Sequence, residues 1–387
     1  MQNRWSVLSL LFVIRVTMAF QFQAVAAMSP LFMESFGVNL ADIGLLIGLY
    51  LAPGIIIAMP GGALGARFGD RKVVAIGLFL MVCGGLAMAI GSHWYMQLLG
   101  RLLAGVGGVL LNVLMSKMVT DWFAGREIGT AMGIFVNSWP VGIALSLLVL
   151  PIVADVAGLQ VALFSVVIFA VFGLLLLYAY KEPATDNISD TQTSGLTGTP
   201  LLAVIIAGSI WGLYNAALGM IFGFAPAMLT SDGWSLATAS FATSIVLWLV
   251  AISVPLGGII ADRTGRRDTV LLFGLISFAI FLTIAPQTDW VIATFAVLGL
   301  VGGIAAGPIM SLPSAVLSPQ TRSQGMGVYF TLFYLGVVIA PMIAGWLSEK
   351  THNAGAAFFF GAFMLALASA ALFAFKLLEA RLKRDAK

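Results

Sequence analysis

The chain has 387 residues, of which 60% are hydrophobic and 9% are charged. Soluble domains contain about 45–50% apolar residues, so this composition excludes an ordinary soluble domain and indicates an integral membrane protein. The net charge is +3, and an excess of Lys and Arg is expected in the cytoplasmic loops of a membrane protein. The basic residues therefore give no reason to expect a nucleic acid partner. A single cysteine, Cys83, excludes an intramolecular disulfide and a cysteine-based metal cluster.

Long apolar runs fill most of the chain. A helix needs about 20 apolar residues to cross a hydrocarbon core of about 30 Å, and only helices or closed barrels satisfy their backbone hydrogen bonds there. Because the runs are continuous rather than alternating, we predict an all-α membrane protein. The twelve predicted transmembrane helices, in chain order, are 6–29, 42–65, 73–92, 95–118, 129–153, 158–180, 200–228, 236–260, 269–286, 290–316, 326–348 and 354–376.

One long polar stretch interrupts this pattern. Residues 181–199 read KEPATDNISDTQTSGLTGT, a composition rich in Pro, Gly, Ser and Thr that is typical of a flexible linker. The predicted domains are therefore an N-terminal six-helix bundle over 1–180, a cytoplasmic linker over 181–199, and a C-terminal six-helix bundle with a basic cytoplasmic tail over 200–387.

The distribution of basic residues predicts the orientation. With twelve spans, sixteen of the nineteen Lys and Arg residues lie on the side of both termini, Lys350 lies on the other side, and Arg15 and Arg101 lie within spans. Because cytoplasmic loops carry the excess of Lys and Arg, we expect a multi-pass protein of the inner (plasma) membrane with both termini in the cytoplasm. The N-terminal apolar run is too long for a signal peptide and is expected to remain as the first span.

Two loops on the side of the termini repeat each other. The later loop reads Gly258-Ile-Ile-Ala-Asp262-Arg263-Thr-Gly265-Arg266-Arg267, and the earlier loop reads Gly62-Ala-Leu-Gly-Ala66-Arg67-Phe-Gly69-Asp70-Arg71-Lys72. Four of their glycine and arginine positions share an offset of 196 residues, and a second pair of similar segments, starting at Ala131 and Gly325, lies 194 residues apart. A repeat of half the chain length predicts two related halves.

The later loop resembles the signature Gly-x-x-x-Asp-Arg-x-Gly-Arg-Arg of the major facilitator superfamily, found between the second and third helices of each half. The resemblance implies the major facilitator fold, with two pseudo-symmetric six-helix bundles, a central site and alternating access; we also expect a monomer. It implies gating roles for Arg67, Asp70, Arg71, Asp262, Arg263, Arg266 and Arg267. Asp262 is expected to engage the positive end of a helix dipole or an arginine. Because Ala66 replaces this acid in the earlier loop, we expect that loop to matter less.

A second resemblance lies in the fourth span. Arg101-Leu-Leu-Ala-Gly105-Val-Gly107-Gly108 is similar to another motif of the superfamily, an Arg followed by a glycine run, which is associated with coupling and with polar networks. It implies a coupling role for Arg101, with Asn112 about three turns further along the helix. The alternative is an Arg whose guanidinium is bound by backbone carbonyls at a helix break.

Polar side chains in the first and fifth spans are candidates for substrate binding. Arg15 lies close to the middle of the membrane, where a charge costs about 2.5–3.5 kcal/mol and is expected to face a cavity or a partner. Gln21 and Gln23 follow it, and Asn137 and Trp139 lie in the fifth span. The alternatives for Arg15 are to reach the cytoplasmic interface or to bond to backbone carbonyls of a neighbouring helix.

Aromatic residues near the middle of spans are further candidates. Trp211, Tyr214 and Asn215 share one helix face in the seventh span, Trp248 lies in the eighth span and Tyr334 in the eleventh. Because Trp and Tyr usually concentrate at the membrane interfaces, their position near the middle indicates a lining of the central site. Packing in the protein interior is the alternative.

All sixteen acidic residues and both histidines fall outside the centre of the membrane. Proton relays in transporters usually use buried Asp, Glu or His, whereas an always-charged guanidinium suits a carboxylate or a small oxyanion. We therefore predict a secondary transporter for a small anionic or polar organic solute. We expect no cofactor and no metal site, and a co-transported ion is left open.

Two other functions are left open, a gradient-driven efflux transporter for apolar or weakly basic compounds and a transporter-like receptor or scaffold. The chain contains no Ser/His/Asp set, Walker loop or metal-ligand cluster, so we predict that it is not an enzyme. Within the superfamily, the Gly- and Pro-rich second span and the segment Asn137-Ser138-Trp139-Pro140 look most similar to bacterial cyanate- and nitrate-type permeases.

Overall fold

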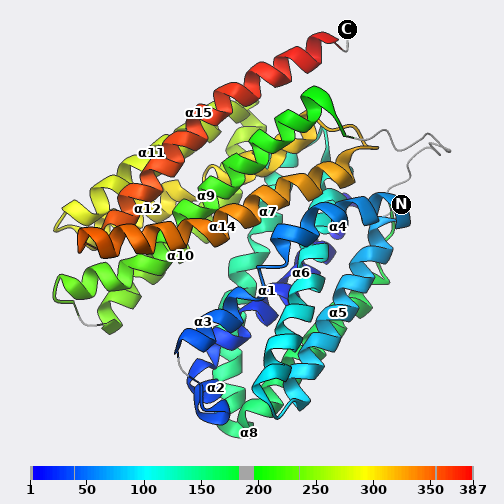
Figure 1. Ribbon diagram of the computed structural model, residues 1–387. Helices are drawn as coiled ribbons and strands as arrows, with labels where there is room; N and C mark the ends of the chain where they lie inside the picture. The colour runs from blue at the N-terminus through cyan, green and yellow to red at the C-terminus, as the bar shows by residue number, and fades with distance from the viewer. Residues whose placement is uncertain (1–2, 39, 183–195, 235, 354, 386–387) are drawn as a thin grey trace. The chain divides into compact units, whose positions relative to one another are not determined.

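The computed structural model describes residues 3–38, 40–182, 196–234, 236–353 and 355–385, and every regular element among them is a helix (Figure 1). The first eight helices are α1 (Arg4–Ala27), α2 (Ser29–Phe36), α3 (Leu40–Gly48), α4 (Gly54–Phe68), α5 (Asp70–Ile90), α6 (Trp94–Phe123), α7 (Ile128–Val136) and α8 (Ser138–Leu177). They are followed by α9 (Gly198–Ser231), α10 (Leu236–Thr264), α11 (Arg267–Ile284), η1 (Ala285–Gln287), α12 (Val291–Gly302), α13 (Ala306–Ser311), η2 (Leu312–Ala315), α14 (Arg322–Thr351) and α15 (Ala356–Asp385). The predicted all-α class is confirmed.

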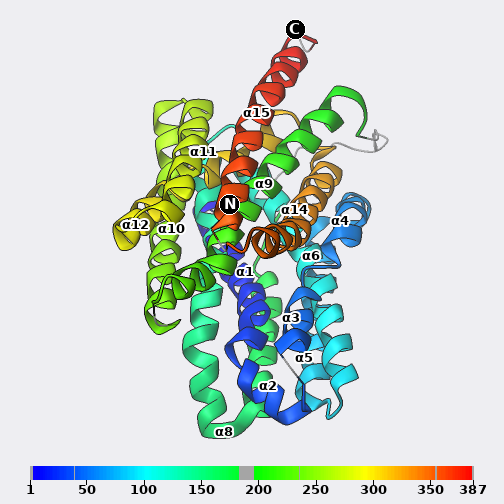
Figure 2. The same cartoon turned by 60° about the vertical axis from the view of Figure 1, so that its left-hand side comes forward.

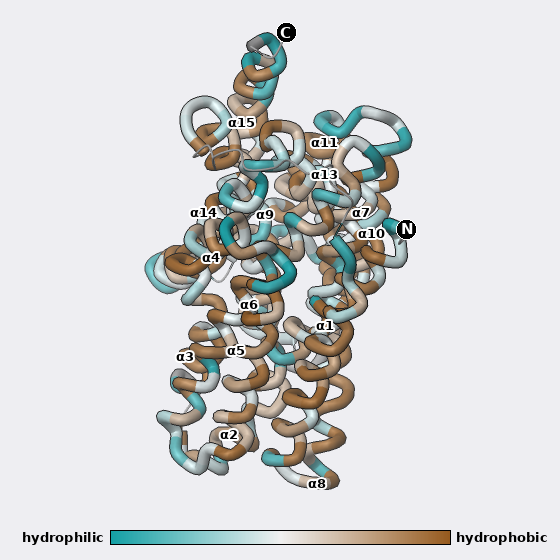
Figure 3. The backbone as a smooth tube through the Cα atoms, turned by 90° about the vertical axis from the view of Figure 1, so that its right-hand side faces the viewer, coloured by the Kyte–Doolittle hydropathy of each residue, from teal (hydrophilic) through white to brown (hydrophobic). Residues whose placement is uncertain are grey.

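Ten helices in the described part of the chain are long and apolar enough to cross a membrane. One of them, Ile128–Leu177, contains both the predicted fifth and sixth spans, which meet at Gly158, where the backbone is not helical (φ 85°, ψ 165°). The predicted second span is divided into α3 and the short apolar helix α4. All twelve predicted spans therefore correspond to helical segments, and Figure 3 shows hydrophobic residues along them.

Besides the change from α7 to α8 at Asn137 in the predicted fifth span, the second and tenth predicted spans are interrupted, and proline lies at both of these breaks. The second span breaks between α3 and α4, where Pro53 has no N–H to donate. The tenth span, predicted as 290–316, ends its first helix at Gly302 and continues as α13 and η2, which contain Pro308 and Pro313. Carbonyl groups left free at such breaks need other donors in the membrane.

The two repeated loops use their shared glycine in the same way. Gly69 separates α4 from α5 with a φ of 88°, and Gly265 separates α10 from α11 with a φ of 63°. Both values lie in the left-handed region that only glycine adopts at little cost. The glycine of the repeated motif is therefore needed for the turn itself.

The chain forms two compact units that each consist of discontinuous segments. Unit 1 comprises Met1–Trp122, Asn137–Ser194 and Pro319–Gly327, and unit 2 comprises Phe123–Val136, Gly195–Ser318 and Val328–Lys387. Compared with the predicted bundles 1–180 and 200–387, two short segments are exchanged between the units, 123–136 and 319–327. Most of the predicted linker 181–199 lies outside the described residues.

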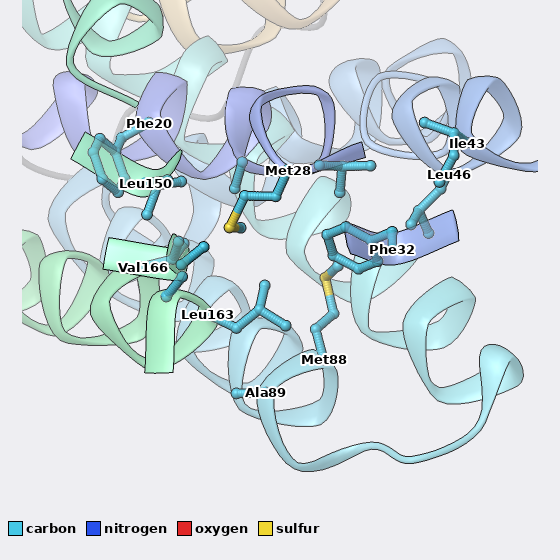
Figure 4. Close-up of a cluster of buried hydrophobic side chains, with 14 residues drawn as sticks. Phe20, Met28, Phe32, Ile43, Leu46, Met88, Ala89, Leu150, Leu163 and Val166 are labelled. Carbon is cyan, nitrogen blue, oxygen red and sulfur yellow. The ribbon is translucent and has the colours of Figure 1, made fainter. Parts of the chain in front are cut away.

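Unit 1 has an apolar core at the end of the helices where α2 lies. Side chains of Phe20, Met28, Phe32, Leu46, Met88, Leu150 and Val166 pack together there from α1, α2, α3, α5 and α8 (Figure 4). Helix α1 runs beside α8 (Figure 2). Close packing of this kind drives helix association in lipid, where burial of apolar surface from water contributes little.

Candidate functional site

The arginine in the middle of the first span is buried in unit 1 between α1, α6 and α8. The Arg15 side chain is only 6% exposed. Its Nε and Nη2 donate to Asn112 Oδ1 at 3.2 and 2.9 Å, and its Nη1 donates to Ser138 Oγ at 3.2 Å. The guanidinium carbon lies 6.0 Å from the centroid of the Trp139 ring. These oxygen atoms belong to neutral side chains, and they fix the orientation of the guanidinium.

This geometry separates the alternatives for Arg15. The side chain is buried and donates to Asn112 and Ser138, which agrees with the expectation of a partner inside the protein. Asn112, which the sequence paired with Arg101, is instead an acceptor for Arg15. Ser138 was not predicted, although it stands between the two residues of the fifth span that were chosen, Asn137 and Trp139.

Aromatic rings lie next to the arginine. The ring centroids of Phe22 and Trp139 are 4.9 Å apart, and those of Phe22 and Tyr50 are 5.6 Å apart. Of these three rings, only Trp139 was predicted as a site residue. Phe22 and Trp139 are half-buried, so the Arg15 site combines a cation with partly accessible aromatic faces.

The amides predicted near Arg15 point elsewhere. Gln21 is buried and its Nε2 donates to the Met81 carbonyl of α5 at 2.9 Å. Gln21 Oε1 and Asn137 Oδ1 are buried and have no hydrogen-bond partner among the described residues, so neither accepts from Arg15. Gln23 is half-buried on α1. The structure therefore joins Arg15 to Asn112, Ser138 and Trp139 rather than to these amides.

Arg101 is fully buried on α6 and donates only to backbone carbonyls in its described contacts. Its Nε donates to Leu46 O at 3.0 Å and its Nη1 to Gln21 O at 2.8 Å, and its Nη2 donates to Phe22 O. Its guanidinium also lies 4.5 Å from the centroid of the Tyr50 ring. Leu46 lies in the last turn of α3, next to the break in the second span. The alternative of an arginine bound by carbonyls at a helix break is the one the structure adopts, and the coupling role stays a prediction.

In unit 2, the predicted aromatic residues form a stack. The Trp211 ring lies 5.5 Å from Tyr214 and 6.1 Å from Phe333, and the Phe333 ring lies 4.9 Å from Tyr334. Tyr214 Oη donates to Gly302 O at 2.8 Å, where the tenth span breaks. Trp211 Nε1 is buried without a partner among the described residues.

Two other predicted residues of unit 2 lie outside this stack. Asn215 Nδ2 donates to the Trp211 carbonyl at 2.9 Å, one turn back on the same helix, so its donor is used locally. Trp248 is 61% exposed on α10, in contrast to the buried Trp211. Trp211, Tyr214 and Tyr334 are thus the predicted aromatic residues that the structure brings together.

The acid of the later loop binds a helix N-terminus. Gly129 N and Thr130 N, in the first turn of α7, donate to Asp262 Oδ1 at 3.2 Å and to Oδ2 at 2.6 Å. A carboxylate at this position satisfies two orphan N–H groups and interacts favourably with the helix dipole. The expected contact of Asp262 with the positive end of a helix is present, and its role in gating stays a prediction.

The basic residues of the later loop differ in their surroundings. Arg263 and Arg266 are exposed. Arg267 pairs with Asp268 at 3.0 Å and with Glu379 of α15 at 2.8 Å. Only Arg267 of these three is therefore tied to another helix by an ion pair in the described contacts.

The earlier loop contains an ion network that the sequence did not predict. Asp70 pairs with Lys117 of α6, Lys117 pairs with Asp121 at 2.8 Å, and Arg322 of α14 pairs with Asp121 at 2.9 Å. Of the predicted residues, Arg71 donates to Tyr178 O at 3.1 Å, and Arg67 is exposed above the Phe68 ring. The contacts of Asp70 give no support to a smaller role for this loop.

A phenol next to this network is buried three residues after the end of α8, beyond the membrane-spanning helix although within the predicted span 158–180. Trp122 Nε1 donates to Tyr180 Oη at 3.4 Å. Burial raises the pKa of Tyr180 above its ordinary value, so the phenol is neutral. No group of three His, Cys, Asp or Glu side chains that could hold a metal ion occurs among the described residues.

Sequence comparison identifies the family. The model of the Major Facilitator Superfamily matches residues 11–230 and 201–387. The chain belongs to the Major Facilitator Superfamily. It is 24% identical to the hexuronate transporter of Bacillus subtilis over 375 residues (89% of this chain, 86% of the relative). It is 23% identical to the probable nitrate transporter NarT of Staphylococcus epidermidis over 351 residues (87% of each chain).

The fold agrees with solved structures of the superfamily. A crystal structure of the Escherichia coli fucose:proton symporter FucP superposes with a TM-score of 0.80 at 15% identity, covering 97% of this chain and 99% of that chain. The predicted twelve-helix major facilitator fold and the resemblance to nitrate-type permeases are confirmed. The chain is a multi-pass integral membrane protein and a secondary transporter, and it is not an enzyme. The cytoplasmic location of both termini stays a prediction.

Proposed function

We propose that this superfamily member transports a small anionic or polar organic solute by alternating access, and that Arg15 binds the anionic group. The observation that carries the proposal is the guanidinium of Arg15, buried in unit 1 and oriented by Asn112 Oδ1 and Ser138 Oγ. A guanidinium is always charged and offers a planar set of donors that matches a carboxylate or oxyanion. Its attraction for an anion is stronger at a site removed from water.

The surroundings of Arg15 favour an organic anion over an inorganic one. The Phe22 and Trp139 rings, 4.9 Å apart, offer apolar faces beside the guanidinium, and carbon-bound hydrogens of a solute pack well against such faces. The names of the relatives support an anion of either kind, since a hexuronate carries a carboxylate and nitrate is an oxyanion. D-Glucuronate and nitrate are therefore the two informative probes.

Binding to purified protein tests this proposal. Melting temperature would be measured by thermal shift with D-glucuronate, sodium nitrate, or an aliphatic amine that represents the efflux alternative. A ligand at about 100 times its Kd adds about 2.7 kcal/mol of stability. We expect stabilisation by D-glucuronate in the wild type, none in Arg15→Gln, and a partial effect in Arg15→Lys, because an ammonium lacks the planar fork.

The matched control is Arg381→Gln, which removes the same charge from an exposed position near the end of α15. It should respond to D-glucuronate like the wild type. Equal stabilisation of the wild type and Arg15→Gln would overturn the role of Arg15. Stabilisation by the amine alone would favour the efflux alternative, for which the buried Trp211 stack of unit 2 is the main observation.

A further inference from the structure

The net positive charge of the chain is concentrated at its C-terminal end. Residues 376–387 contain five Lys or Arg and two acidic residues, which is a net charge of +3. The whole chain also carries +3, so residues 1–375 are neutral overall. The excess of basic over acidic residues is thus a property of this one segment, which we call the C-terminal basic segment.

The C-terminal basic segment continues the last transmembrane helix. Helix α15 runs from Ala356 to Asp385, and Figure 2 shows its last turns projecting beyond α9 and α11. Glu379 of α15 pairs with Arg267, the first residue of α11, at 2.8 Å. Because α11 begins its apolar span at Arg267, Glu379 marks the level of one membrane surface. The part of α15 that follows Glu379 therefore lies at or beyond this surface, and Figure 3 shows its tip as hydrophilic.

Two acidic side chains hold α15 beside α11 at this level. Asp268 pairs with Arg267 at 3.0 Å and with Lys376 at 3.3 Å. Glu379, which is buried, pairs with Lys383 at 2.8 Å in addition to Arg267. These ion pairs fix the orientation of the end of α15, so the side chains on its other faces have a defined direction.

The exposed face of α15 is apolar within the span and basic at the end. Phe373 and Leu377 are 58% and 73% exposed, and Arg381 and Arg384 are exposed further along the helix. With 3.6 residues per turn, these four residues lie within about 80° of one another, and Glu379 lies on the opposite side. From Phe373 to Arg384 the face is about 16 Å long, which is enough for a lipid headgroup and the adjoining part of an acyl chain.

The two arginines of this face keep their charge for another partner. Neither forms an ion pair with an acidic side chain that the structure describes, in contrast to Lys376 and Lys383. Arg384 Nε donates to the Ala380 carbonyl at 3.4 Å, one turn back on the same helix. Residues three apart on a helix are neighbours, so Arg381 and Arg384 together attract an anion.

We propose that the face formed by Phe373, Leu377, Arg381 and Arg384 binds an anionic phospholipid. The two guanidinium groups bind the headgroup phosphate, because arginine offers a planar set of donors that matches it. The acyl chains lie along Phe373 and Leu377. Clusters of about four to eight Lys or Arg beside a transmembrane helix attract anionic lipids, and the same positive charge disfavours the ammonium of a zwitterionic headgroup. All four residues belong to unit 2, and the site does not rest on the proposed function.

Lipid titration followed by native mass spectrometry tests this site on the full chain. Phosphatidylglycerol and phosphatidylcholine with identical acyl chains would be titrated separately onto delipidated protein in a non-ionic detergent. We expect the wild type to bind phosphatidylglycerol about 25-fold more tightly, since each of the two arginines contributes about fivefold. In Arg381→Gln/Arg384→Gln the two lipids should bind with Kd values within about twofold of each other.

The matched control is Lys72→Gln/Arg126→Gln, which removes two exposed basic side chains outside the C-terminal basic segment. It should keep the preference for phosphatidylglycerol within about twofold of the wild type. Because all four side chains are exposed, both double variants should melt within about 2 °C of the wild type. The soluble headgroup analogue sn-glycerol 3-phosphate lacks acyl chains and should give no detectable binding at the same concentrations.

Equal binding of the two lipids to the wild type would overturn the lipid site. Loss of the preference in Lys72→Gln/Arg126→Gln to the same extent as in Arg381→Gln/Arg384→Gln would also overturn it, because the preference would then depend on overall charge. Binding of sn-glycerol 3-phosphate as tight as that of phosphatidylglycerol would show a site for soluble phosphate and not for lipid. Failure of D-glucuronate to bind the wild type, in contrast, would overturn the proposed function and leave the lipid site standing.

Discussion

Replacing Arg101 tests whether its main role is to hold α6 against the broken second span. In Arg101→Met the side chain keeps much of its length and loses its donors and charge. The Gln21 and Phe22 carbonyls lie inside α1, where helical N–H groups still bond to them. The Leu46 carbonyl is different, because the Tyr50 N–H, its helical donor, bonds to Ile47 O instead. Leu46 O therefore depends on Arg101 for a hydrogen-bond donor. We expect the loss of this hydrogen bond to dominate the decrease in stability.

The magnitude follows from these contacts. A buried carbonyl left without a donor costs about 1–3 kcal/mol. The stacked position of the guanidinium 4.5 Å from the Tyr50 ring adds about 2 kcal/mol when desolvated. We expect Arg101→Met to lose about 3–5 kcal/mol, and for a unit of about 150–250 residues each kcal/mol lowers the melting temperature by about 2–4 °C. The expected decrease is therefore on the order of 10 °C.

Thermal unfolding in detergent measures this decrease, with Arg67→Met as the matched control. Arg67 also lies over a ring, that of Phe68, but is exposed, so its replacement should change stability by less than about 0.5 kcal/mol. Arg101→Lys keeps the charge and loses the planar fork, so we expect an intermediate decrease and slower turnover with unchanged substrate preference. A melting temperature of Arg101→Met within about 2 °C of the wild type would refute the reasoning, since about 1 kcal/mol or less would then be at stake.

Two more predictions concern the contacts of Asp262 and Ser138. Asp262→Asn removes a negative charge from the α7 N-terminus, and the interaction of such a charge with the helix dipole contributes about 0.3–1 kcal/mol. Cysteine-accessibility labelling should therefore show a changed ratio of inward- and outward-open forms. An unchanged ratio contradicts the gating role. Ser138→Ala removes one acceptor of Arg15. The Kd for D-glucuronate, measured by calorimetry, should therefore rise about five- to tenfold, which is a loss of about 1–1.4 kcal/mol of binding free energy. Unchanged affinity contradicts a role of Ser138 in orienting the guanidinium.

Much of the fold follows from hydrophobicity alone, because each span must be apolar and helical to cross lipid. The positions at which a helix breaks within a span are harder to predict from the sequence. Pro53 and Pro308 are visible in the sequence, but proline often occurs within transmembrane helices without ending them. Whether a helix stops depends on donors from elsewhere in the fold, such as Arg101 for Leu46 O and Tyr214 for Gly302 O.

The sequence predicts the central charge of the candidate site, Arg15, but it does not predict the side chains that accept its hydrogen bonds. The depth of Arg15 in the first span marked it as a candidate, since burial of a charge is costly. Its acceptors lie 97 and 123 residues away along the chain, and only tertiary packing brings them together. Gln21 follows Arg15 by six residues, about 240° around a helix, so the two side chains face different neighbours. Helical geometry could have excluded that pairing from the sequence.

The two repeated loops show how related halves come to make different contacts. Each contains a glycine with positive φ, Gly69 or Gly265. Each also contacts the start of another helix, α14 for the earlier loop and α7 for the later one. At the start of α7, Asp262 accepts from two backbone N–H groups. The earlier loop has Ala66 at the position of Asp262, so it lacks this carboxylate. Its contact with the start of α14 is instead a hydrogen bond from Ser323 Oγ to Gly62 O at 2.7 Å.

The ionic contact of the earlier loop is made by Asp70 and Lys117. Asp121 continues this contact to Arg322 at the start of α14. The contact of the later loop depends on one carboxylate and a helix dipole, while that of the earlier loop depends on four charged side chains that are largely buried. Salt screens buried pairs much less than exposed ones. Removal of one acidic side chain is therefore expected to weaken the contact of the later loop more than that of the earlier loop. Asp262 has no ionic neighbour to replace it in its described contacts. The loss of Asp70, in contrast, leaves Lys117 paired with Asp121.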